Sequence, residues 1–339
     1  MIKYLQLSGS PFHIGMALGE FSAPILHKHI VNTQLWKNLT AWRDSSILKE
    51  MQTLVQQQHP YIWDELQGIA KGAQIPAEDI FLWNSRSDLI PIINGSSTTV
   101  MQIAQGTSRI THNEDGDPAL KDYCAIAEIE IPGHTSFASF IQPGSLPGNS
   151  FSVTESNMAI IVNYLKINEP QSGVPTMVLN RSLIEAADIS QAIQQVQQAP
   201  RSGNCHLTIG QIGKKSLMSI EFTSNKASVE NLNSISAHTN HIVHKQMKDE
   251  SYKVSQSSAE RLQTANRWIA GAESVDALAL MADQSHESLP IYRNDPVAPD
   301  GEHTIVNVDI QINTDEILWD VREHPMEAPI YKMRGIKHF

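Results

Sequence analysis

Apolar residues recur at helical spacing over most of residues 11–90 of this 339-residue chain. The stretches FHIGMALGEFSAPILHKHIV and YIWDELQGIAKGA carry apolar side chains three and four positions apart, which predicts helices with one apolar face. Pro76, followed by Ala-Glu-Asp, is typical of a helix start, because proline fits the first turn and acids favour the positive end of a helix. We therefore expect a mostly helical N-terminal segment.

Near Ser96 the pattern changes to short β-branched or aromatic runs broken by Gly, Pro and Asn, which is typical of strands. The predicted strands are residues 98–104, 108–113, 123–131, 135–141, 150–154, 158–165, 204–212, 215–222, 226–232, 303–312 and 316–321. Helical spacing returns in residues 182–199, 257–272 and 274–284. Ser257 or Ser258, and Ser274, are candidate N-caps for the last two of these helices.

Helices, a strand-rich block, paired helices and further strands predict an α+β fold in which helices cover sheets from the outside. The connections between strands look like hairpins, which favours mostly antiparallel sheets. No internal repeat, low-complexity tract or linker divides the chain, so we expect residues 1–339 to form a single domain. Residues 295–302, with two prolines and a glycine, are the most loop-like part of the second half.

Acidic residues outnumber basic ones by 36 to 25, which gives a formal net charge of −11. Such a chain is a poor partner for nucleic acid or for an anionic membrane surface, so we expect neither. No secretory signal pattern and no run of about 18 apolar residues is visible. The two cysteines, Cys124 and Cys205, fall in apolar strands and are expected in the core of a cytoplasmic protein. The sequence leaves open whether the chain forms a homo-oligomer.

The stretch NGSSTTV, residues 94–100, places Gly95 before a cluster of hydroxyl side chains. Asn-Gly is a strong hairpin-turn signal, so a plain turn is one interpretation. The other comes from the strands that follow, because a hairpin turning near Gly106 would bring Ser96 beside the HNED cluster, residues 112–115. A hydroxyl next to a carboxylate is a candidate nucleophile next to a candidate proton acceptor.

Further segments occur in the order and spacing of one enzyme family. They are ELQGIAKGAQIPAEDIFLWNSRSDL, GSSTTV, HNEDGD, GSLPGNSFSVTESNMAIIVNYL, RSGNCHLTIG, HTNHIV and SSAERLQ. Together they resemble the N-terminal-nucleophile hydrolases related to acyl-coenzyme A:6-aminopenicillanic acid acyltransferase, a group that also contains β-alanyl-amine hydrolases. The resemblance runs almost from one end of the chain to the other.

This resemblance implies a four-layer αββα sandwich and a chain that cleaves itself between Gly95 and Ser96. Residues 1–95 would then form a small chain and residues 96–339 a large one. Residue 96 would attack the Gly95 carbonyl, and its freed α-amine, with a pKa of about 8, would serve as its own general base. The family uses no metal or other cofactor, and its substrates are small-molecule amides.

Position 96 departs from the family, whose nucleophile is cysteine. Serine serves in other N-terminal-nucleophile enzymes, so Ser96 can act as the nucleophile in principle. Alternatively, Ser96 replaces a native cysteine, and this change would block cleavage or turnover because a hydroxyl ionises far less readily than a thiol. An uninterrupted chain of 339 residues fits an uncleaved precursor.

The resemblance also implies roles for residues that are far apart in the sequence. Asp115 matches the aspartate that orients the new α-amine, and Asn204 matches the amide that stabilises the oxyanion. Arg261 matches an arginine on a late helix, close to the nucleophile. The residues expected to shape the substrate pocket are Asn113, Glu114, His238 and Asn240. Each of these residue types more often has a plain structural use when taken alone.

The leading hypothesis is an autoprocessed hydrolase of small N-acyl amines, with β-alanyl amides as candidates because the excess of acids favours an amine-bearing substrate. An acyltransferase that uses coenzyme A would share the same residues, although no basic cluster suits the coenzyme A phosphates. A catalytically inert binding protein is a third hypothesis. The fourth is a zinc hydrolase, because His238, His241 and His244 are spaced three apart and one helix could present them together.

Overall fold

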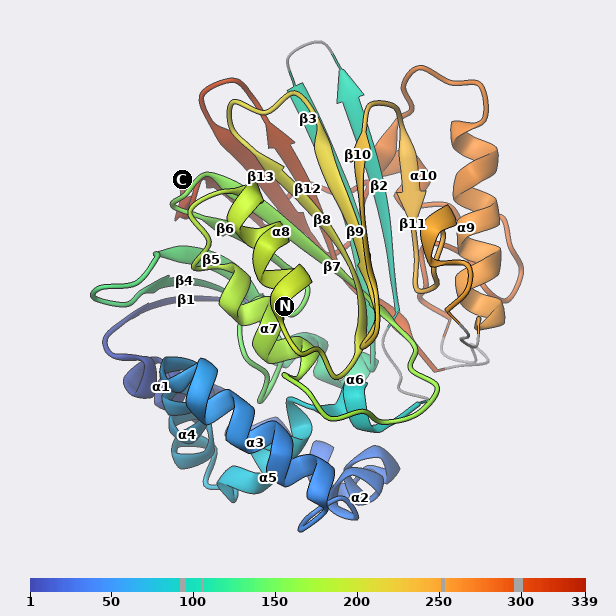
Figure 1. Cartoon of the computed structure of the whole chain (residues 1–339). Helices are drawn as coiled ribbons and strands as arrows, with labels where there is room; N and C mark the ends of the chain where they lie inside the picture. The colour runs from blue at the N-terminus through green and yellow to red at the C-terminus, as the bar shows by residue number, and fades with distance from the viewer. Residues whose placement is uncertain (92–95, 105–106, 251–253, 296–300) are drawn as a thin grey trace.

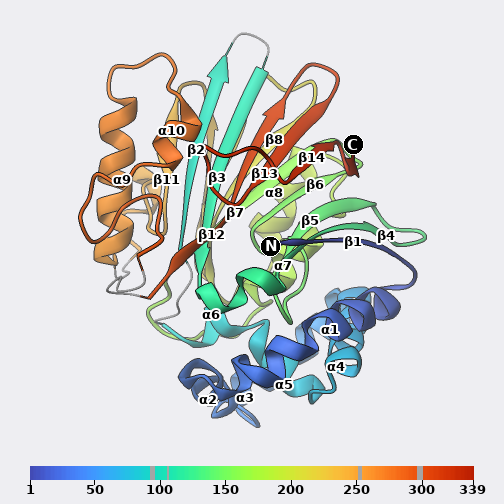
Figure 2. The ribbon, with the colours of Figure 1, turned by 180° about the vertical axis from the view of Figure 1, so that it is seen from behind.

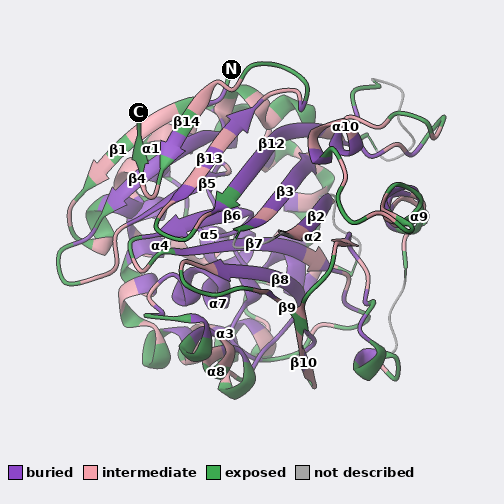
Figure 3. Cartoon of the chain, turned by 90° about the horizontal axis from the view of Figure 1, so that it is seen from above, coloured by how far each residue is buried: buried purple, intermediate pink, exposed green. Residues whose placement is uncertain are grey.

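Two stacked β-sheets form the centre of the molecule, as seen from above in Figure 3. The computed structural model describes residues 1–91, 96–104, 107–250, 254–295 and 301–339. Within these residues the strands form an eight-stranded sheet, sheet A, and a seven-stranded sheet, sheet B. In spatial order, sheet A contains β1 (Lys3–Ser8), β4 (Ala125–Glu130), β5 (Phe137–Ile141), β6 (Phe151–Thr154), β7 (Met158–Leu165), β8 (Asn204–Gln211), β9 (Leu217–Phe222) and β10 (Ala227–Leu232). Sheet B contains β11 (Ser236–His238), β2 (Ser97–Ala104), β3 (Thr107–Gly116), β12 (His303–Ile312), β13 (Ile317–Arg322), β14 (Tyr331–Arg334) and β15 (Lys337–His338).

The pairing of the strands is almost entirely antiparallel, as the hairpin-like connections predict. Among the described strands the exception is β1, which pairs in parallel with β4 and places Lys3 opposite Ala125. The sequence pattern does not predict β1, because its partner is more than a hundred positions away along the chain. The pattern also does not predict β11, β14 or β15. The strands that it does predict are all present, as β2 to β10, β12 and β13.

Helices cover the outer side of sheet A and one end of sheet B (Figures 1 and 2). The N-terminal segment supplies α1 (Pro11–Lys28), α2 (Gln34–Thr40), α3 (Ser46–Gln58), α4 (Pro60–Ala73), α5 (Ala77–Trp83) and α6 (Arg86–Leu89). Alongside this segment, α7 (Thr176–Leu183) and α8 (Ile189–Gln198) also lie on sheet A. On the β11–β2–β3 end of sheet B lie α9 (Gln256–Ile269) and α10 (Ala277–Met281). The predicted α+β fold, a four-layer αββα sandwich with mostly antiparallel sheets, is confirmed. None of the described helices is both long and apolar enough to span a bilayer.

The two late helices begin at residues other than those expected from the sequence. The hydroxyl of Ser255 caps α9 by accepting from the Ser258 N–H, and Asp276 caps α10. The predictions of Ser257 or Ser258, and of Ser274, are therefore wrong. Ser258 is the third residue of α9, and its hydroxyl instead accepts a hydrogen bond from the Asn240 N–H.

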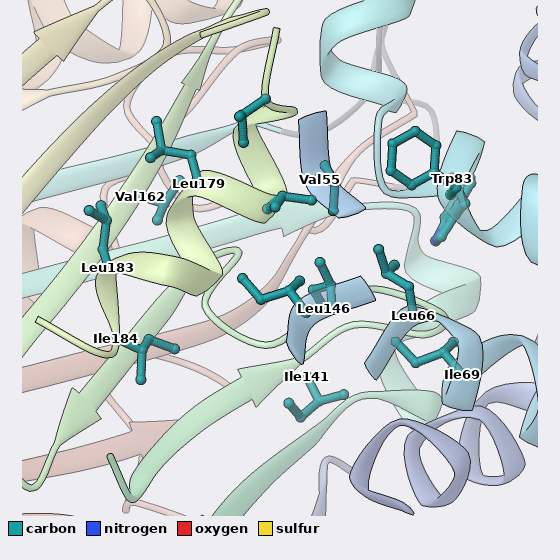
Figure 4. Packing of buried hydrophobic residues seen from close by; sticks show 14 of the residues in the cluster. Val55, Leu66, Ile69, Trp83, Ile141, Leu146, Val162, Leu179, Leu183 and Ile184 are labelled. Carbon is teal, nitrogen blue, oxygen red and sulfur yellow. The ribbon is translucent and has the colours of Figure 1, made fainter. Parts of the chain in front are cut away.

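One continuous apolar cluster joins the N-terminal helices, α7 and α8 to the outer face of sheet A (Figure 4). Leu66 and Trp83 come from the N-terminal helices, Leu183 from α7, and Val162 from β7. A second cluster lies between the sheets, and Ile161, the neighbour of Val162, belongs to it. This alternation is what the period-two geometry of a strand buried on both faces produces.

The helices α1 and α4 pack backbone against backbone. A Cβ atom added to Gly15 would lie 2.0 Å from the Glu65 carbonyl oxygen, and one added to Gly68 would lie 2.1 Å from the Phe12 carbonyl oxygen. Both distances are shorter than any real contact, so glycine is required where the two helices cross. This close packing fixes the N-terminal helices as a unit against sheet A.

Candidate active site

Ser96 lies immediately before β2, beside the end of β3. The two strands form an antiparallel hairpin in which Ser97 is opposite Glu114, and the Asp115 N–H donates to the Ser96 carbonyl at 2.8 Å. This is the side-by-side placement of Ser96 and the HNED cluster that the sequence predicts. Gly95, the other half of the predicted cleavage site, lies outside the described residues.

The Ser96 hydroxyl lies among two carboxylates and a guanidinium. Its Oγ is 2.5 Å from Glu302 Oε2 and 3.3 Å from Asp115 Oδ2. Nη1 of Arg293 donates to the same Oγ at 2.8 Å and to Glu302 Oε2 at 2.7 Å. A hydroxyl has one proton to donate, and the shorter distance assigns it to Glu302. The arrangement provides a candidate nucleophile, a candidate proton acceptor and a fixed positive charge within one hydrogen-bonded group.

Asp115 is buried, with 1% of its surface exposed. Its Oδ1 accepts from Thr304 Oγ1 at 2.7 Å, and its Oδ2 lies 3.8 Å from Arg293 Nη1. Burial raises the pKa of Asp115 to about 6; the guanidinium groups of Arg293 and Arg261 oppose the rise, and the Glu302 carboxylate adds to it. A carboxylate that titrates this close to neutrality can change its protonation state during a reaction.

Arg261 holds the first residues of β2 rather than Ser96 itself. Its Nη1 donates to the Ser97 carbonyl at 2.5 Å and to Thr98 Oγ1 at 2.8 Å, and its Nη2 donates to Asn240 Oδ1 at 2.9 Å. That same oxygen of Asn240 accepts from the Ser97 N–H at 2.9 Å. The structure therefore brings Arg261 next to the nucleophile strand, and its contacts fix the backbone on which Ser96 depends.

Asn204 lies at the start of β8, opposite Leu165 of β7. Its Nδ2 donates to the Lys166 carbonyl at 2.7 Å, which ties β8 to the chain that follows β7. It is not among the described residues that line the cavity containing Ser96, whereas Asn240 is. The structure thus brings together Ser96, Asp115 and Arg261, and no contact among the described residues joins Asn204 to them.

Asn113 and Glu114, two further residues of the HNED cluster, were both expected to line the pocket, and only Glu114 does so. Asn113 points to the opposite face of β3, where its Nδ2 donates to the Met281 carbonyl of α10 at 2.9 Å. Glu114 faces the cavity and accepts hydrogen bonds from Gln142 at 2.8 Å and from Ser150 at 2.8 Å. The alternation along β3 separates the two neighbours.

The three histidines of the HTNHIVH stretch have separate partners. Nε2 of His238 lies 2.9 Å from Glu221 Oε1, Nδ1 of His241 lies 2.7 Å from Ser258 Oγ, and Nε2 of His244 lies 2.8 Å from Ser219 Oγ. Burial lowers the pKa of His241 to about 4. The described part of the chain contains no group of three or more His, Cys, Asp or Glu side chains that could hold a metal ion. His238 lies between the sheets rather than on the cavity, and its ring stacks on His206 at a centroid distance of 3.5 Å.

A cavity of about 290 Å³ is lined by Ser96 and Asp115, among others, and has two walls of different origin. The residues of the N-terminal segment that line it are His29, Ile30, Thr33, Gln34, Leu35, Trp83 and Arg86. The residues from the strands and their loops include Ser96, Ser97, Glu114, Asp115, Gln142, Tyr164 and Asn240. A nucleophile, polar groups and apolar surface therefore converge on one concave site, as an enzyme active site requires.

With this geometry in place, the family can be identified. A sequence profile described as acyl-coenzyme A:6-aminopenicillanic acid acyl-transferase matches residues 104–319, well over half of the chain. The chain belongs to this family. The matched span contains Asp115, Asn240, Arg261, Arg293 and Glu302, and it begins after Ser96.

The chain is similar in sequence to the 40 kDa form of acyl-coenzyme A:6-aminopenicillanic-acid-acyltransferase from Emericella nidulans. The two are 22% identical over 246 residues, which is 71% of this chain and 66% of the relative, just under two thirds of its length. Among solved structures, a variant of conjugated bile acid hydrolase from Clostridium perfringens superposes with a TM-score of 0.44 and 8% identity, covering 70% of this chain and 91% of that one. Penicillin V acylase from Agrobacterium tumefaciens gives a TM-score of 0.38 and 12% identity, covering 70% and 85%.

Ser96 forms one hydrogen-bonded group with Asp115, Glu302 and Arg293, and the sequence pattern does not predict the last two. Glu302 is the last residue of the loop-like segment 295–302. Its position as an acid in an irregular segment is the one feature of the sequence that could have indicated a functional role. Arg293 stands in no recognisable pattern. Both reach Ser96 from about two hundred positions away, because β12 pairs with β3 in sheet B.

Proposed function

We propose that this member of the acyl-transferase family is an amide hydrolase that cleaves small N-acyl amines through an acyl-enzyme on residue 96. The observation that carries this proposal is the position of Ser96 Oγ, within hydrogen-bond distance of Glu302 and Arg293 and on the wall of a cavity. A partly buried hydroxyl that contacts both a carboxylate and a guanidinium on the wall of a cavity is more typical of a reacting group than of a structural one.

The proposal includes self-cleavage between Gly95 and Ser96. The Ser96 hydroxyl gives its proton to Glu302 and attacks the Gly95 carbonyl, so that a C–O bond forms. The C–N bond then breaks as Glu302 passes this proton to the leaving nitrogen of residue 96, which leaves an ester between Gly95 and the Ser96 oxygen. Water then hydrolyses the ester, and residue 96 becomes an N-terminus with a free α-amine. Asp115 and Glu302, which contact the Ser96 hydroxyl, would accept hydrogen bonds from that amine, whose pKa of about 8 suits a general base.

In the hydrolysis of substrate, the acyl carbon forms a bond to residue 96 while the amine leaves with a proton. Water then attacks the acyl-enzyme and releases the carboxylic acid. We assign the stabilising amide to Asn240 rather than Asn204, because Asn240 lines the cavity. The Asn240 Nδ2 donates to the Tyr164 carbonyl at 3.0 Å and to Ser97 Oγ at 3.2 Å. A substrate oxygen would replace the longer of these two hydrogen bonds, the one to Ser97.

The first experiment compares the Ser96 protein with the Ser96→Cys protein by intact mass. We expect the Ser96→Cys protein to separate into residues 1–95 and 96–339 under denaturing conditions, because a thiol ionises more readily than a hydroxyl. The Ser96 protein either cleaves more slowly, if serine is the native nucleophile, or stays whole, if it replaces a cysteine. A folded Ser96→Cys protein that remains intact after prolonged incubation contradicts self-cleavage.

The second experiment measures amine release from a panel of N-acyl amines by the Ser96→Cys protein, with β-alanyl amides included. The same protein is offered acyl-coenzyme A with amine acceptors, because the Emericella relative is named an acyltransferase. Hydrolysis without coenzyme A supports the amide hydrolase. Turnover confined to coenzyme A donors supports the acyltransferase, and binding without turnover supports an inert binding protein.

A further inference from the structure

Arg86, at the start of α6, is a buried cation whose hydrogen bonds all go to neutral groups. It lines the cavity and has 9% of its surface exposed. Its Nη1 donates to the Trp83 carbonyl at 2.7 Å, to Ser145 Oγ at 3.2 Å and to Met177 Sδ at 3.3 Å, and its Nη2 donates to Gln142 Oε1 at 3.3 Å. No carboxylate in the described residues makes an ion pair with it.

The donors of Arg86 are only partly used. A guanidinium carries five N–H bonds, and the contacts of Nη1 and the single contact of Nη2 leave the Nε–H and one Nη2–H without an acceptor among the described residues. The Nε and Nη2 atoms form one edge of the group, and two parallel N–H bonds on one edge match the two oxygens of a carboxylate. The Trp83 ring, whose centroid is 4.3 Å from the Arg86 Cζ, holds the guanidinium plane in place.

A second buried arginine shows what a purely structural role looks like. Arg201 also donates only to neutral groups, and these are all backbone carbonyls. They belong to Thr223 and, at the end of α8, to Val196, Gln197 and Ala199. Helix ends favour such a cation. Arg201 does not line the cavity, and Arg86 does. In Arg86, by contrast, only Nη1 donates to a helix end, because it bonds the carbonyl of Trp83, the last residue of α5.

Glu114, on the strand wall of the same cavity, is a charged group that would favour a cationic substrate instead. Its Oε1 already accepts from Gln142, and its Oε2 accepts from Ser150 at 2.8 Å and lies 3.1 Å from His112 Nε2. Gln142 stands between the two charges, because its amide oxygen accepts from Arg86 while its amide nitrogen donates to Glu114. The carboxylate is thus satisfied by its own neighbours, whereas the guanidinium keeps an open edge.

We propose that the Nε/Nη2 edge of Arg86 binds a carboxylate at the far end of the substrate's acyl chain. The preferred substrates are then N-acyl amines with an ω-carboxyacyl group, such as succinyl, glutaryl or adipyl, rather than β-alanyl amides. This inference rests on the proposed amide hydrolase function and names the class of acyl group that it accepts. It reverses the expectation drawn from net charge, because the local cation and not the bulk charge faces the ligand.

The test uses anilides that differ only in the acyl group: succinyl, glutaryl and adipyl, each beside the neutral ω-amide of the same length, with β-alanyl anilide as the cationic case. In the Ser96→Cys protein we expect kcat/KM for the best ω-carboxyacyl anilide to exceed that of its neutral ω-amide by about tenfold or more, as for a lost charge-assisted hydrogen bond. Arg86→Met should remove this preference. Arg201→Met, which removes a buried arginine away from the cavity, should keep it.

A binding measurement keeps this inference separate from the proposed function. Calorimetric titration of the Ser96 protein with succinate, glutarate and adipate should detect binding that weakens about tenfold or more in Arg86→Met but not in Arg201→Met. If dicarboxylates bind through Arg86 while no amide is cleaved, the carboxylate site stands and the hydrolase proposal fails. If amides are cleaved with neutral or cationic acyl groups preferred, or if the preference survives in Arg86→Met, the carboxylate site is overturned. Absence of both binding and preference also overturns it.

Discussion

The two walls of the cavity hold their charges in different ways. On the wall built from strands, Ser96 and Asp115 line the cavity and contact Glu302 and Arg293, so that opposite charges neutralise one another. On the wall built from the N-terminal segment, Arg86 is held by carbonyl, hydroxyl and amide groups. Charges that touch are suited to exchanging protons, and a charge held by neutral groups remains available to a ligand. In the proposed function the first wall performs the reaction and the second selects the acyl group.

The change with the largest expected effect removes the nucleophile from the strand wall. Ser96→Ala should lower amide hydrolysis at least about 10³-fold relative to Ser96→Cys, because no acyl-enzyme can form. Steady-state rates and mass spectrometry of the acylated protein measure this. The neighbouring variant Ser97→Ala is the control, since it loses the bonds from Asn163 and Asn240 but keeps residue 96. Equal turnover in Ser96→Ala and Ser96→Cys would move the chemistry to another residue.

The pKa of Asp115 gives the second prediction. Because burial raises this pKa from 3.8 to about 6, the folded chain holds the proton more tightly than the unfolded chain does. Its contribution to the free energy of unfolding therefore falls as pH rises from about 4 to about 6, by about 3 kcal/mol in total. Denaturant titrations of the parent and of Asp115→Asn across this range should show that the difference between them changes by this amount.

Activity should depend on the same proton with the opposite sign. Ionised Asp115 can accept a hydrogen bond from the α-amine of residue 96, so kcat/KM should rise as pH rises through about 6. Asp115→Asn should lose this limb of the pH profile. Asp309→Asn, which removes a buried carboxylate bound by Arg109 away from the cavity, should keep it. A limb that persists in Asp115→Asn would assign the titration to another group.

On the helical wall the expected effects are on stability rather than on rate. Gly68→Ala should lower the free energy of unfolding by about 2 kcal/mol, because its Cβ would meet the Phe12 carbonyl oxygen at 2.1 Å and force α1 and α4 apart. Gly116→Ala is the matched control, since its Cβ would lie 3.6 Å from Ile305 Cγ1, an ordinary contact. If both variants unfold at the same denaturant concentration, the close packing of α1 on α4 does not matter for stability.

The smallest effect is expected where the two walls meet at an exposed contact between a histidine and an aspartate. His29 Nε2 lies 2.6 Å from Asp117 Oδ2, and both side chains are more than a third exposed, at 36% and 39%. Solvent screens such a pair, so His29→Asn should change the free energy of unfolding by less than about 1 kcal/mol. Thermal unfolding in low and high salt measures this. A larger loss would mean that this contact holds the N-terminal segment in place.

The elements that were predicted correctly are those whose signal lies within the element itself. The strand β12 alternates β-branched residues over ten positions, and α4 repeats apolar residues at helical spacing, so local pattern is enough. The same reasoning places Ser96 beside Asp115, because a short hairpin joins them. It cannot find Glu302 or Arg293, since their approach to Ser96 depends on β12 pairing with β3. It also cannot place Asn204, whose amide is used by the Lys166 carbonyl.

The parallel pairing of β1 with β4 has a consequence for solubility. β1 is the edge strand of sheet A and pairs with β4, a strand in which five of six residues are buried. Without β1, β4 would present a row of free backbone N–H and C=O groups next to apolar surface, which is the usual starting point for edge-to-edge aggregation. If the chain is cut before Ser96, β1 belongs to the fragment that the large chain could otherwise lose. The N-terminal fragment would then protect its partner from self-association for as long as it stays bound.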